Sequence, residues 1–143
     1  MKTRKLGQNG PTVSAIGLGA MSFGGIFGET TEAESLRCLD AMLDHGISFI
    51  DTANIYGMGI SETIIGTWLA SRRPQVTIAT KASFVAGPPR RIDNSEAHLR
   101  SELEASLKRL NRDHVELFYI HRREHARPLA EVIGSLARLI EEG

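Results

Sequence analysis

The sequence predicts an α/β protein built around a parallel β-sheet. Short apolar segments alternate four times with longer segments whose apolar residues recur every three or four positions. Strands of about five residues alternating with helices of ten or more are typical of parallel strands joined by right-handed crossovers. The composition shows no linker-like change, so we expect one domain over residues 1–143.

The expected elements, in chain order, are a hairpin over residues 3–14 and strands over 15–19, 47–50, 76–80 and 115–120, which alternate with helices over 31–45, 61–71, 95–110 and 128–143. Asn9-Gly10 predicts the hairpin, because both residue types tolerate the positive φ of a tight turn. Thr31 and Glu34 have the spacing of a capping box at the start of the first helix, and Gly46 follows its last turn.

The later helices also have recognisable boundaries. Ser61 is expected to cap the second helix, and Pro74 to break the chain after it. Pro128 suits the first turn of the last helix. Residues 86–94 are polar and rich in glycine and proline, so we expect them to form a loop.

Composition limits the classes of function. Lysine plus arginine number 17, as do aspartate plus glutamate, which argues against the basic face of a nucleic-acid-binding protein. The one cysteine excludes an internal disulfide, and no apolar stretch is long enough to span a bilayer or to form a secretory signal. We therefore expect a cytoplasmic protein that binds neither membranes nor nucleic acid. The histidines show no metal-ligand spacing, so no metal is expected.

Four residues with useful chemistry follow the expected strands. Asp51, Lys81 and His121 each come directly after a strand, and Tyr56 lies in a loop after one. The carboxyl ends of parallel strands share one face, where sites are built. Each residue also has a plainer alternative: a turn cap, a packed tyrosine, a solvated lysine or a partly buried histidine. Their occurrence together favours a site.

These residue types suit the reduction of a carbonyl group. A phenol has a pKa of about 10 and is a poor acid at neutral pH. A lysine ammonium beside a phenol stabilises its ionised form, and a carboxylate would hold that ammonium in place. A histidine could orient the carbonyl oxygen by hydrogen bonding. Such a set could protonate a carbonyl oxygen as hydride reaches its carbon.

Three stretches of the sequence resemble the aldo-keto reductases: Gly-Leu-Gly-Ala-Met at residues 17–21, Asp-Thr-Ala-Asn-Ile-Tyr-Gly from residue 51 with Ser-Glu at 61–62, and Leu-Phe-Tyr-Ile-His-Arg at 117–122. The second stretch is the most specific. The resemblance covers essentially the whole chain. It implies an α/β fold of the (β/α)8 TIM-barrel type, of which residues 1–143 would be the N-terminal half: a β-hairpin plus the first four β/α units.

The resemblance also implies roles for the residues at the strand ends. The catalytic residues would be Asp51, Tyr56, Lys81 and His121. Tyr56 would be the general acid in the reduction of an aldehyde or ketone to an alcohol, and Lys81 would tune it through its link to Asp51. His121 would orient the carbonyl of the substrate. The protein would then be an NADP-dependent carbonyl reductase.

The cofactor implied by the resemblance is NADP(H), with NAD(H) as the alternative, bound without a Rossmann fold. The residues expected along the cofactor are Gly19, Ala20, Met21 and Asp51, and those expected to line the apolar substrate pocket are Phe23 and Phe84. The glycines of residues 17–22 come near a Rossmann fingerprint. The third glycine is absent and no helix is expected to begin there, so a Rossmann site is the weaker interpretation.

Half a barrel would have consequences for activity and association. A complete barrel needs roughly 250 residues, and four strands cannot close it. The strands near Gly19 and His121 would keep open edges, beside an uncovered apolar face. We therefore expect two copies to pair as half-barrels. Two alternatives to an enzyme are a non-catalytic aldo-keto-reductase-like partner subunit and an inactive half-barrel fragment that self-associates.

Overall fold

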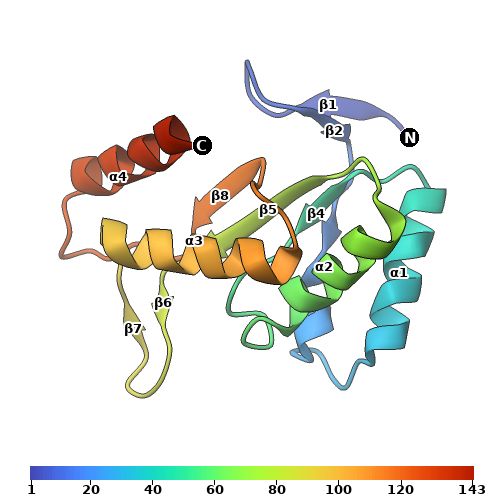
Figure 1. Cartoon of the computed structure of the whole chain (residues 1–143), viewed down its shortest axis with the longest axis horizontal. Coiled ribbons are helices and arrows are strands. Elements are labelled where there is room, and N and C mark those ends of the chain that lie inside the picture. The colour runs from blue at the N-terminus through green and yellow to red at the C-terminus, as the bar shows by residue number, and fades with distance from the viewer.

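A four-stranded parallel sheet with strand order β3–β4–β5–β8 lies at the centre of the molecule (Figure 1). The computed structural model describes all residues from Met1 to Gly143. In chain order, the elements are β1 (Thr3–Lys5), β2 (Thr12–Ser14), β3 (Leu18–Gly19), the 3₁₀ helix η1 (Ala20–Gly24), α1 (Glu32–Asp44), β4 (Phe49–Asp51), α2 (Ile60–Arg72), β5 (Thr77–Ala82), β6 (Phe84–Val85), β7 (Arg91–Ile92), α3 (Glu96–Leu110), β8 (Leu117–Ile120) and α4 (Leu129–Glu142). The expected alternation of parallel strands and helices is confirmed.

The expected amino-terminal hairpin forms, but residues 6–11 connect its strands, and the positive φ of this connection is at Gly7 (+64°) and not at Asn9 or Gly10. Strands β1 and β2 pair antiparallel, with Thr3 opposite Ser14. The hairpin is fixed to the sheet by a reciprocal contact, in which the Ser14 amide donates to Ser48 Oγ at 3.0 Å and the Ser48 amide donates to Ser14 Oγ at 2.9 Å. This contact places the hairpin at the amino end of β4, away from the end that carries Asp51.

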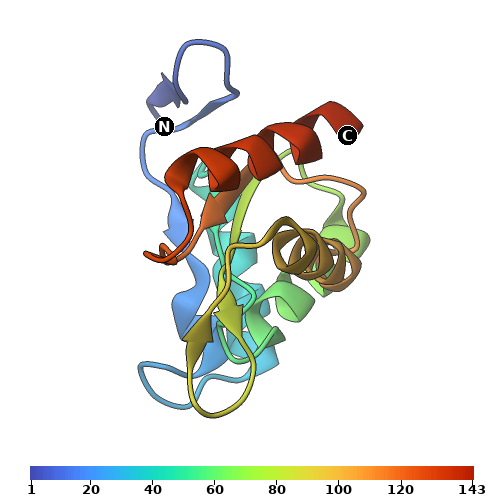
Figure 2. The ribbon, with the colours of Figure 1, turned by 90° about the vertical axis from the view of Figure 1, so that its left-hand side faces the viewer.

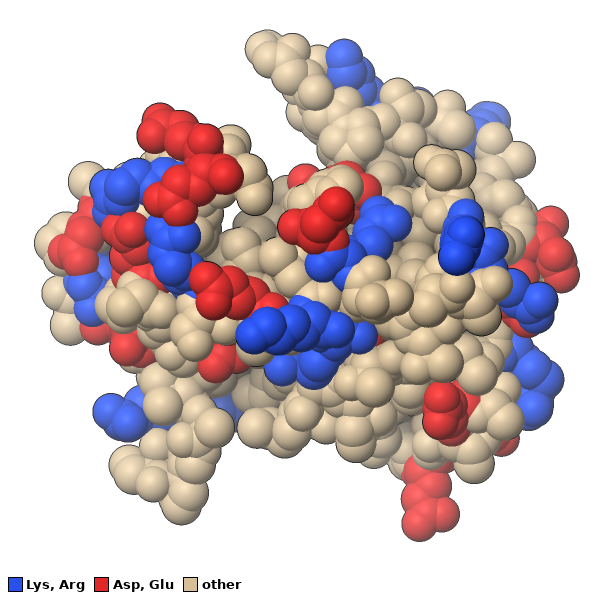
Figure 3. Space-filling model, in the orientation of Figure 1, with Lys and Arg blue, Asp and Glu red and all other residues tan.

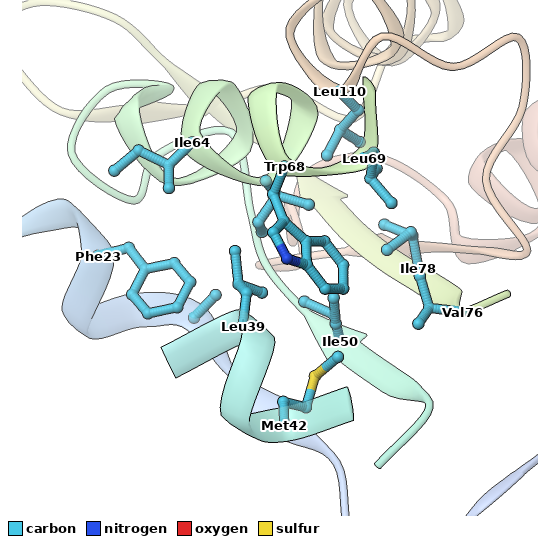
Figure 4. Packing of buried hydrophobic residues seen from close by; sticks show 12 residues of the cluster. Phe23, Leu39, Met42, Ile50, Ile64, Trp68, Leu69, Val76, Ile78 and Leu110 are labelled. Carbon is cyan, nitrogen blue, oxygen red and sulfur yellow. The ribbon is translucent and has the colours of Figure 1, made fainter. Parts of the chain in front are cut away.

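Helices α1, α2 and α3 lie on one side of the sheet (Figures 1 and 2). The main hydrophobic core fills the space between the sheet and α1 and α2, and Trp68 lies at its centre (Figure 4). The indole N–H of Trp68 donates to Asp40 Oδ1 at 2.9 Å, so its one polar atom is satisfied. A smaller cluster of Ala82, Leu99 and Val132 joins β5, α3 and α4.

The capping signals differ in how well they locate the helix ends. Thr31 and Glu34 form the expected capping box on α1, and Ser95 caps α3 through the His98 amide. Helix α2 begins one residue earlier than expected, with Gly59 at φ +96° in the cap position. Ser61 therefore lies inside the first turn of α2, and its hydroxyl is used elsewhere.

Three segments differ from the sequence-based expectation. Strand β5 extends to Ala82, so Lys81 lies within the strand and not after it. The expected loop over residues 86–94 is the turn and second strand of a β6–β7 hairpin, whose strands of two residues are too short to show a pattern. No helix was expected after β3, but the 3₁₀ helix η1 forms there, and Gly25 with φ +75° follows its last residue.

Charged residues of both signs are interspersed over the face shown in Figure 3. Several of them pair between helices, as in the contact of Arg138 on α4 with Glu96 on α3. Arg100 on α3 likewise contacts Glu142 on α4 at 2.5 Å. No helix combines the length and the apolar character that crossing a membrane requires.

Candidate active site

The Lys81 ammonium lies between the Asp51 carboxylate and the Tyr56 hydroxyl. Lys81 Nζ donates to Asp51 Oδ1 at 2.5 Å and to Tyr56 Oη at 3.1 Å. A third bond, to the carbonyl oxygen of Thr52 at 2.8 Å, uses the remaining ammonium proton. All three donors of the ammonium are thus fixed, and its charge is held beside the phenol.

The strand register brings these side chains together. Asp51 ends β4 and pairs with Ala79 of β5, two residues before Lys81 on the same face of β5. The chain after β4 stays against β5, because the Thr52 amide donates to Ala79 O at 2.9 Å and the Asn54 amide to Lys81 O at 3.1 Å. Tyr56 lies in this short loop, so the backbone hydrogen bonds between the loop and β5 determine where Tyr56 lies.

His121 faces the phenol from the end of the next strand. Its ring centroid lies 5.8 Å from that of Tyr56 in an edge-to-face arrangement, and Nδ1 is buried without a hydrogen-bond partner. Burial of the ring lowers the pKa of His121 below its ordinary value, and the nearby positive charge of Lys81 lowers that pKa further. The imidazole is therefore neutral near neutral pH.

The loop that carries Tyr56 is held by close backbone contacts. Gly57 has φ +60°, and a Cβ built on Gly24 would lie 2.3 Å from the Gly57 nitrogen. Only glycines allow η1 and this loop to approach so closely. Ser61 Oγ donates to Ala20 O at 2.9 Å and lies 2.9 Å from Thr52 Oγ1. Ser61, which was predicted to cap a helix, instead connects the segments that follow β3 and β4 by hydrogen bonds.

Helix α3 supports the same loop from the outside. Asn54 Nδ2 donates to Glu102 Oε2 at 2.6 Å. The side chain of Arg109 packs on Gly59, where an added Cβ would lie 2.7 Å from Arg109 Cδ. Arg109 Nε also donates to Oε2 of the fully buried Glu62 at 2.7 Å.

Sequence reasoning missed these supports. The partners lie almost fifty residues apart in the chain, and the only local signal was the Ser-Glu pair at residues 61–62. Glu62 uses its other oxygen to accept a hydrogen bond from Thr80 Oγ1 at 2.5 Å, next to Lys81 in β5.

A second network fixes the loop after His121. Ser83 Oγ accepts hydrogen bonds from Asn94 Nδ2 at 3.0 Å and from the Arg122 amide at 3.1 Å. Asn94 and Glu124 bind reciprocally, since the Asn94 amide donates to Glu124 Oε2 at 2.8 Å and the Glu124 amide to Asn94 Oδ1 at 2.7 Å. Glu124 carried no expected role, and the structure shows that it anchors this loop.

The two phenylalanines expected to line a substrate pocket lie in different surroundings. Phe84 stands against His121, with ring centroids 5.2 Å apart, and it lines a cavity of about 280 Å³ together with Asn54 and Arg90. Phe23 instead packs into the hydrophobic core near Leu39, with 4% of its surface exposed (Figure 4). The expectation for Phe23 is corrected, because η1 turns the ring under α1 and α2.

The residues expected along the cofactor differ in how accessible they are. A Cβ built on Gly19 meets no atom within 4 Å, so the backbone there is open to a ligand. The Asp51 side chain is 35% exposed, so a carboxylate oxygen is within reach of a ribose hydroxyl. Met21 is partly exposed, while Ala20 is fully buried and its carbonyl accepts from Ser61. Gly19, Met21 and Asp51 thus fit part of a nicotinamide cofactor.

No group of three or more histidine, cysteine, aspartate or glutamate side chains is placed to hold a metal ion. The ionisable groups that meet at the site are a phenol, an ammonium, a carboxylate and an imidazole. A phenol beside a fixed ammonium can give up its proton and leave a stabilised phenolate.

The parallel sheet with a site at its carboxyl end defines part of an α/β barrel of the TIM type, as the sequence predicts. Residues 15–143 match the model of the aldo/keto reductase family, and the chain belongs to that family.

Individual relatives agree with the family match. An uncharacterised oxidoreductase of Bacillus subtilis is 38% identical, with all of this chain and 47% of the relative aligned. A Schizosaccharomyces pombe aldo-keto reductase, named with NADP(+), is 33% identical over 99% of this chain and 42% of its own length. The structure of an aldo-keto reductase from Bacillus halodurans, in a holo form, superposes with a TM-score of 0.89 at 32% identity, covering 100% of this chain and 47% of that one. The chain thus spans about half the length of these relatives.

Proposed function

We propose that the protein to which residues 1–143 belong reduces aldehydes or ketones to alcohols with NADP(H). The observation that carries this proposal is the bridging ammonium of Lys81, which contacts the Asp51 carboxylate at 2.5 Å and the Tyr56 hydroxyl at 3.1 Å. A phenol held in this way is a proton donor whose conjugate base is already paired with a positive charge. We propose further that these residues form the N-terminal half of the barrel, which the coverage of the relatives supports.

Tyr56 is the general acid in this proposal. A bound nicotinamide cofactor supplies hydride to the carbonyl carbon of the substrate. The Tyr56 hydroxyl gives its proton to the carbonyl oxygen, so that an alcohol forms and a phenolate remains. The Lys81 ammonium stabilises that phenolate at close range, and Asp51 keeps the ammonium in place.

His121 orients the substrate. The depressed pKa of His121 supports a neutral imidazole, which can donate one N–H bond to a carbonyl oxygen without adding a charge that would compete with Lys81. The imidazole and the phenol ring meet edge to face with centroids 5.8 Å apart, so a carbonyl oxygen bound by the imidazole would also lie near the phenol. Phe84 also packs edge to face with the imidazole and would give the substrate an apolar wall.

Gly19, Met21 and Asp51 would hold part of the cofactor. The open backbone at Gly19 supports close approach of the cofactor, and the exposed part of the Asp51 carboxylate suits a ribose hydroxyl. Ala20 would contribute through the backbone position that Ser61 fixes. The relative from S. pombe that is named with NADP(+) favours the phosphorylated form of the cofactor over NAD(H).

The test uses Tyr56→Phe, with Tyr119→Phe as its matched control. Tyr119 is the other tyrosine of the chain and lies on β8 opposite Lys81 of β5, but its hydroxyl makes no hydrogen bond with Lys81. NADPH binding is measured by calorimetry, and turnover of an aromatic aldehyde by the loss of NADPH absorbance. We expect Tyr56→Phe to lower kcat about 10²- to 10⁴-fold without loss of NADPH binding, and Tyr119→Phe to keep both. The proposal is contradicted if Tyr56→Phe turns over the aldehyde as fast as wild type. It is also contradicted if the wild-type protein neither binds NADPH nor turns over the aldehyde.

A further inference from the structure

We propose that Glu102 on α3 is a positioning residue, which holds the loop of Tyr56 beside Lys81 by fixing the side chain of Asn54. The inference rests on the proposed function, because the position of a general acid matters only for the reaction that it serves. The contacts that carry it are made between the chain after β4, strand β5 and helix α3.

Asn54 is the last residue of the Tyr56 loop whose backbone is bound to β5. Its amide donates to Lys81 O at 3.1 Å. Two residues later, the Tyr56 amide donates to Ala53 O at 3.1 Å, within the turn and no longer to the strand. A group that fixes Asn54 therefore fixes the start of the turn that carries the phenol.

The side chain of Asn54 has one hydrogen-bond partner. The residue is buried, with 9% of its surface exposed, and Nδ2 donates to Glu102 Oε2 at 2.6 Å. The other polar atom, Oδ1, is buried without a partner. An ionised carboxylate only accepts hydrogen bonds, so an amide turned over would place two acceptors against each other. The Glu102 carboxylate thus selects one orientation of the buried amide.

This hydrogen bond matters because the amide has room to turn without it. Asn54, Glu102 and Phe84 line the same cavity of about 280 Å³. A buried amide that loses its partner is left unsatisfied, which favours another position of the side chain. Such a movement acts on the backbone of Asn54, at the bond to Lys81 O.

Helix α3 gives Glu102 a fixed position. Leu99 and Leu110, on either side of Glu102 in the helix, are fully buried. A group on a packed helix positions its neighbour more precisely than a group on a loop. Glu102 makes no hydrogen bond to the four candidate catalytic residues, so its effect on the phenol passes through Asn54.

The experiment exchanges the donor and the acceptor of this bond. Asn54→Asp keeps nearly the same shape but sets a carboxylate against that of Glu102, and two adjacent carboxylates repel each other when both are ionised. In the double variant Asn54→Asp with Glu102→Gln, the glutamine amide can donate to the new carboxylate. The matched control is Asn54→Asp with Glu104→Gln, which has the same net charge. Glu104 lies on the same helix and is exposed.

The variants are compared with wild type in the protein that carries residues 1–143. Turnover of an aldehyde is followed by NADPH absorbance from about pH 5 to about pH 9, and NADPH binding by calorimetry. We expect Asn54→Asp to lower kcat about tenfold or more at the upper end of this range, with little change in KM or in NADPH binding, because the proton donor is misplaced.

The loss of kcat in Asn54→Asp should shrink as the pH falls. One of two adjacent carboxyl groups then holds a proton and can donate it to the other. Arg90 and Arg109 are the other charged residues that line this cavity, and guanidinium groups do not titrate in this range. The double variant with Glu102→Gln should recover to within about threefold of wild type at every pH, whereas the double variant with Glu104→Gln should not recover.

Carbon-13 NMR of protein labelled at tyrosine Cζ gives a readout that does not need turnover. The Tyr56 resonance is identified as the one that is lost in Tyr56→Phe. We expect this resonance to shift in Asn54→Asp and to return in the double variant with Glu102→Gln, while the resonance of Tyr119 stays in place. Circular dichroism confirms that each variant is folded. If Asn54→Asp does not fold, Glu102→Ala removes the acceptor without adding a charge and should also lower kcat about tenfold.

The inference is overturned if kcat of Asn54→Asp equals that of wild type at every pH. It is also overturned if the two double variants recover equally, because the effect would then be one of net charge. A wild-type protein that does not turn over the aldehyde would overturn the proposed function alone. In that case a Tyr56 resonance that shifts and returns as expected supports the positioning role of Glu102, and a resonance that does not shift overturns it.

Discussion

Gly66 and Gly134 are both glycines within helices, and alanine should have opposite effects at the two positions. An alanine Cβ at Gly66 on α2 would lie 2.0 Å from the carbonyl oxygen of Arg109 and 2.9 Å from the carbonyl carbon of Leu110 on α3. At Gly134 on α4, the nearest atom is Arg138 Nη1 at 3.6 Å, which is an ordinary van der Waals contact. Gly66 thus allows two helices to touch, whereas Gly134 has free space.

The magnitude follows from these contacts. The 2.0 Å contact is with backbone, so α2 and α3 must separate by more than 1 Å to reach a normal distance. Overpacking of this kind costs about 3 kcal/mol, while alanine gains about 1 kcal/mol in helix propensity over glycine. We expect Gly66→Ala to lower the free energy of unfolding by about 2 kcal/mol and the Tm by about 6 °C. Gly134→Ala should raise the free energy of unfolding by up to about 1 kcal/mol.

The assay is urea unfolding followed by far-UV circular dichroism, at one protein concentration for all variants, because self-association would shift the apparent stability. The slope of the unfolding transition should stay the same for the three proteins. A Gly66→Ala chain as stable as wild type would refute the account of α2–α3 packing. A destabilised Gly134→Ala chain would refute the free space on α4.

Three further outcomes are expected. Lys81→Met should lower kcat for an aldehyde about 10²-fold or more with little change in KM, because it removes the positive charge beside Tyr56. The rate of turnover is measured by the loss of NADPH absorbance. Thr31→Ala should lower the free energy of unfolding by about 1 kcal/mol, because it breaks the capping box of α1, as urea titration would show. The free energy of unfolding should fall as the pH drops below about 6.5, because His121 binds a proton more readily in the unfolded chain, and His121→Asn should lack this part of the pH dependence.

Each of these outcomes has a result that contradicts it. If Lys81→Met had the same kcat as wild type, the Lys81 ammonium would have no role in the mechanism. A Thr31→Ala chain as stable as wild type would mean that solvent replaces the cap without loss. For His121, the sign follows from a lowered pKa in the folded state: the stabilisation is complete above the unfolded pKa and is lost as the pH falls toward the folded pKa. A pH dependence equal in His121→Asn and wild type would contradict the burial of this ring.

The sequence predicts the framework of the fold and the meeting of three side chains, for a physical reason. Apolar periodicity identifies the strands, and parallel strands bring their carboxyl ends to one edge. Asp51 and Lys81 therefore meet without being neighbours in the chain, and Tyr56 joins them through a short loop. His121 comes directly after β8, so the same reasoning places its ring beside the phenol of Tyr56.

Contacts between distant polar residues leave no comparable pattern. Glu62 lies on the buried face of α2, where a carboxylate is costly unless it is paired, and its partner Arg109 lies on α3. A charged residue within an amphipathic helix is usually solvated, so neither side chain suggests the pair. The burial of Phe23 was missed for a related reason, since a short 3₁₀ helix has no periodicity to show which way a ring turns.

The supports of the Tyr56 loop explain why packing between α2 and α3 bears on the site. Arg109 provides the carbonyl oxygen that lies against Gly66, and the same residue packs on Gly59 and pairs with Glu62. A separation of the two helices would therefore move Arg109 away from the loop that ends at Gly59. Because Tyr56 is three residues before Gly59, its 3.1 Å contact with Lys81 depends on that loop keeping its place. A substitution such as Gly66→Ala should thus lengthen the contact between the phenol and the ammonium, although it touches neither residue.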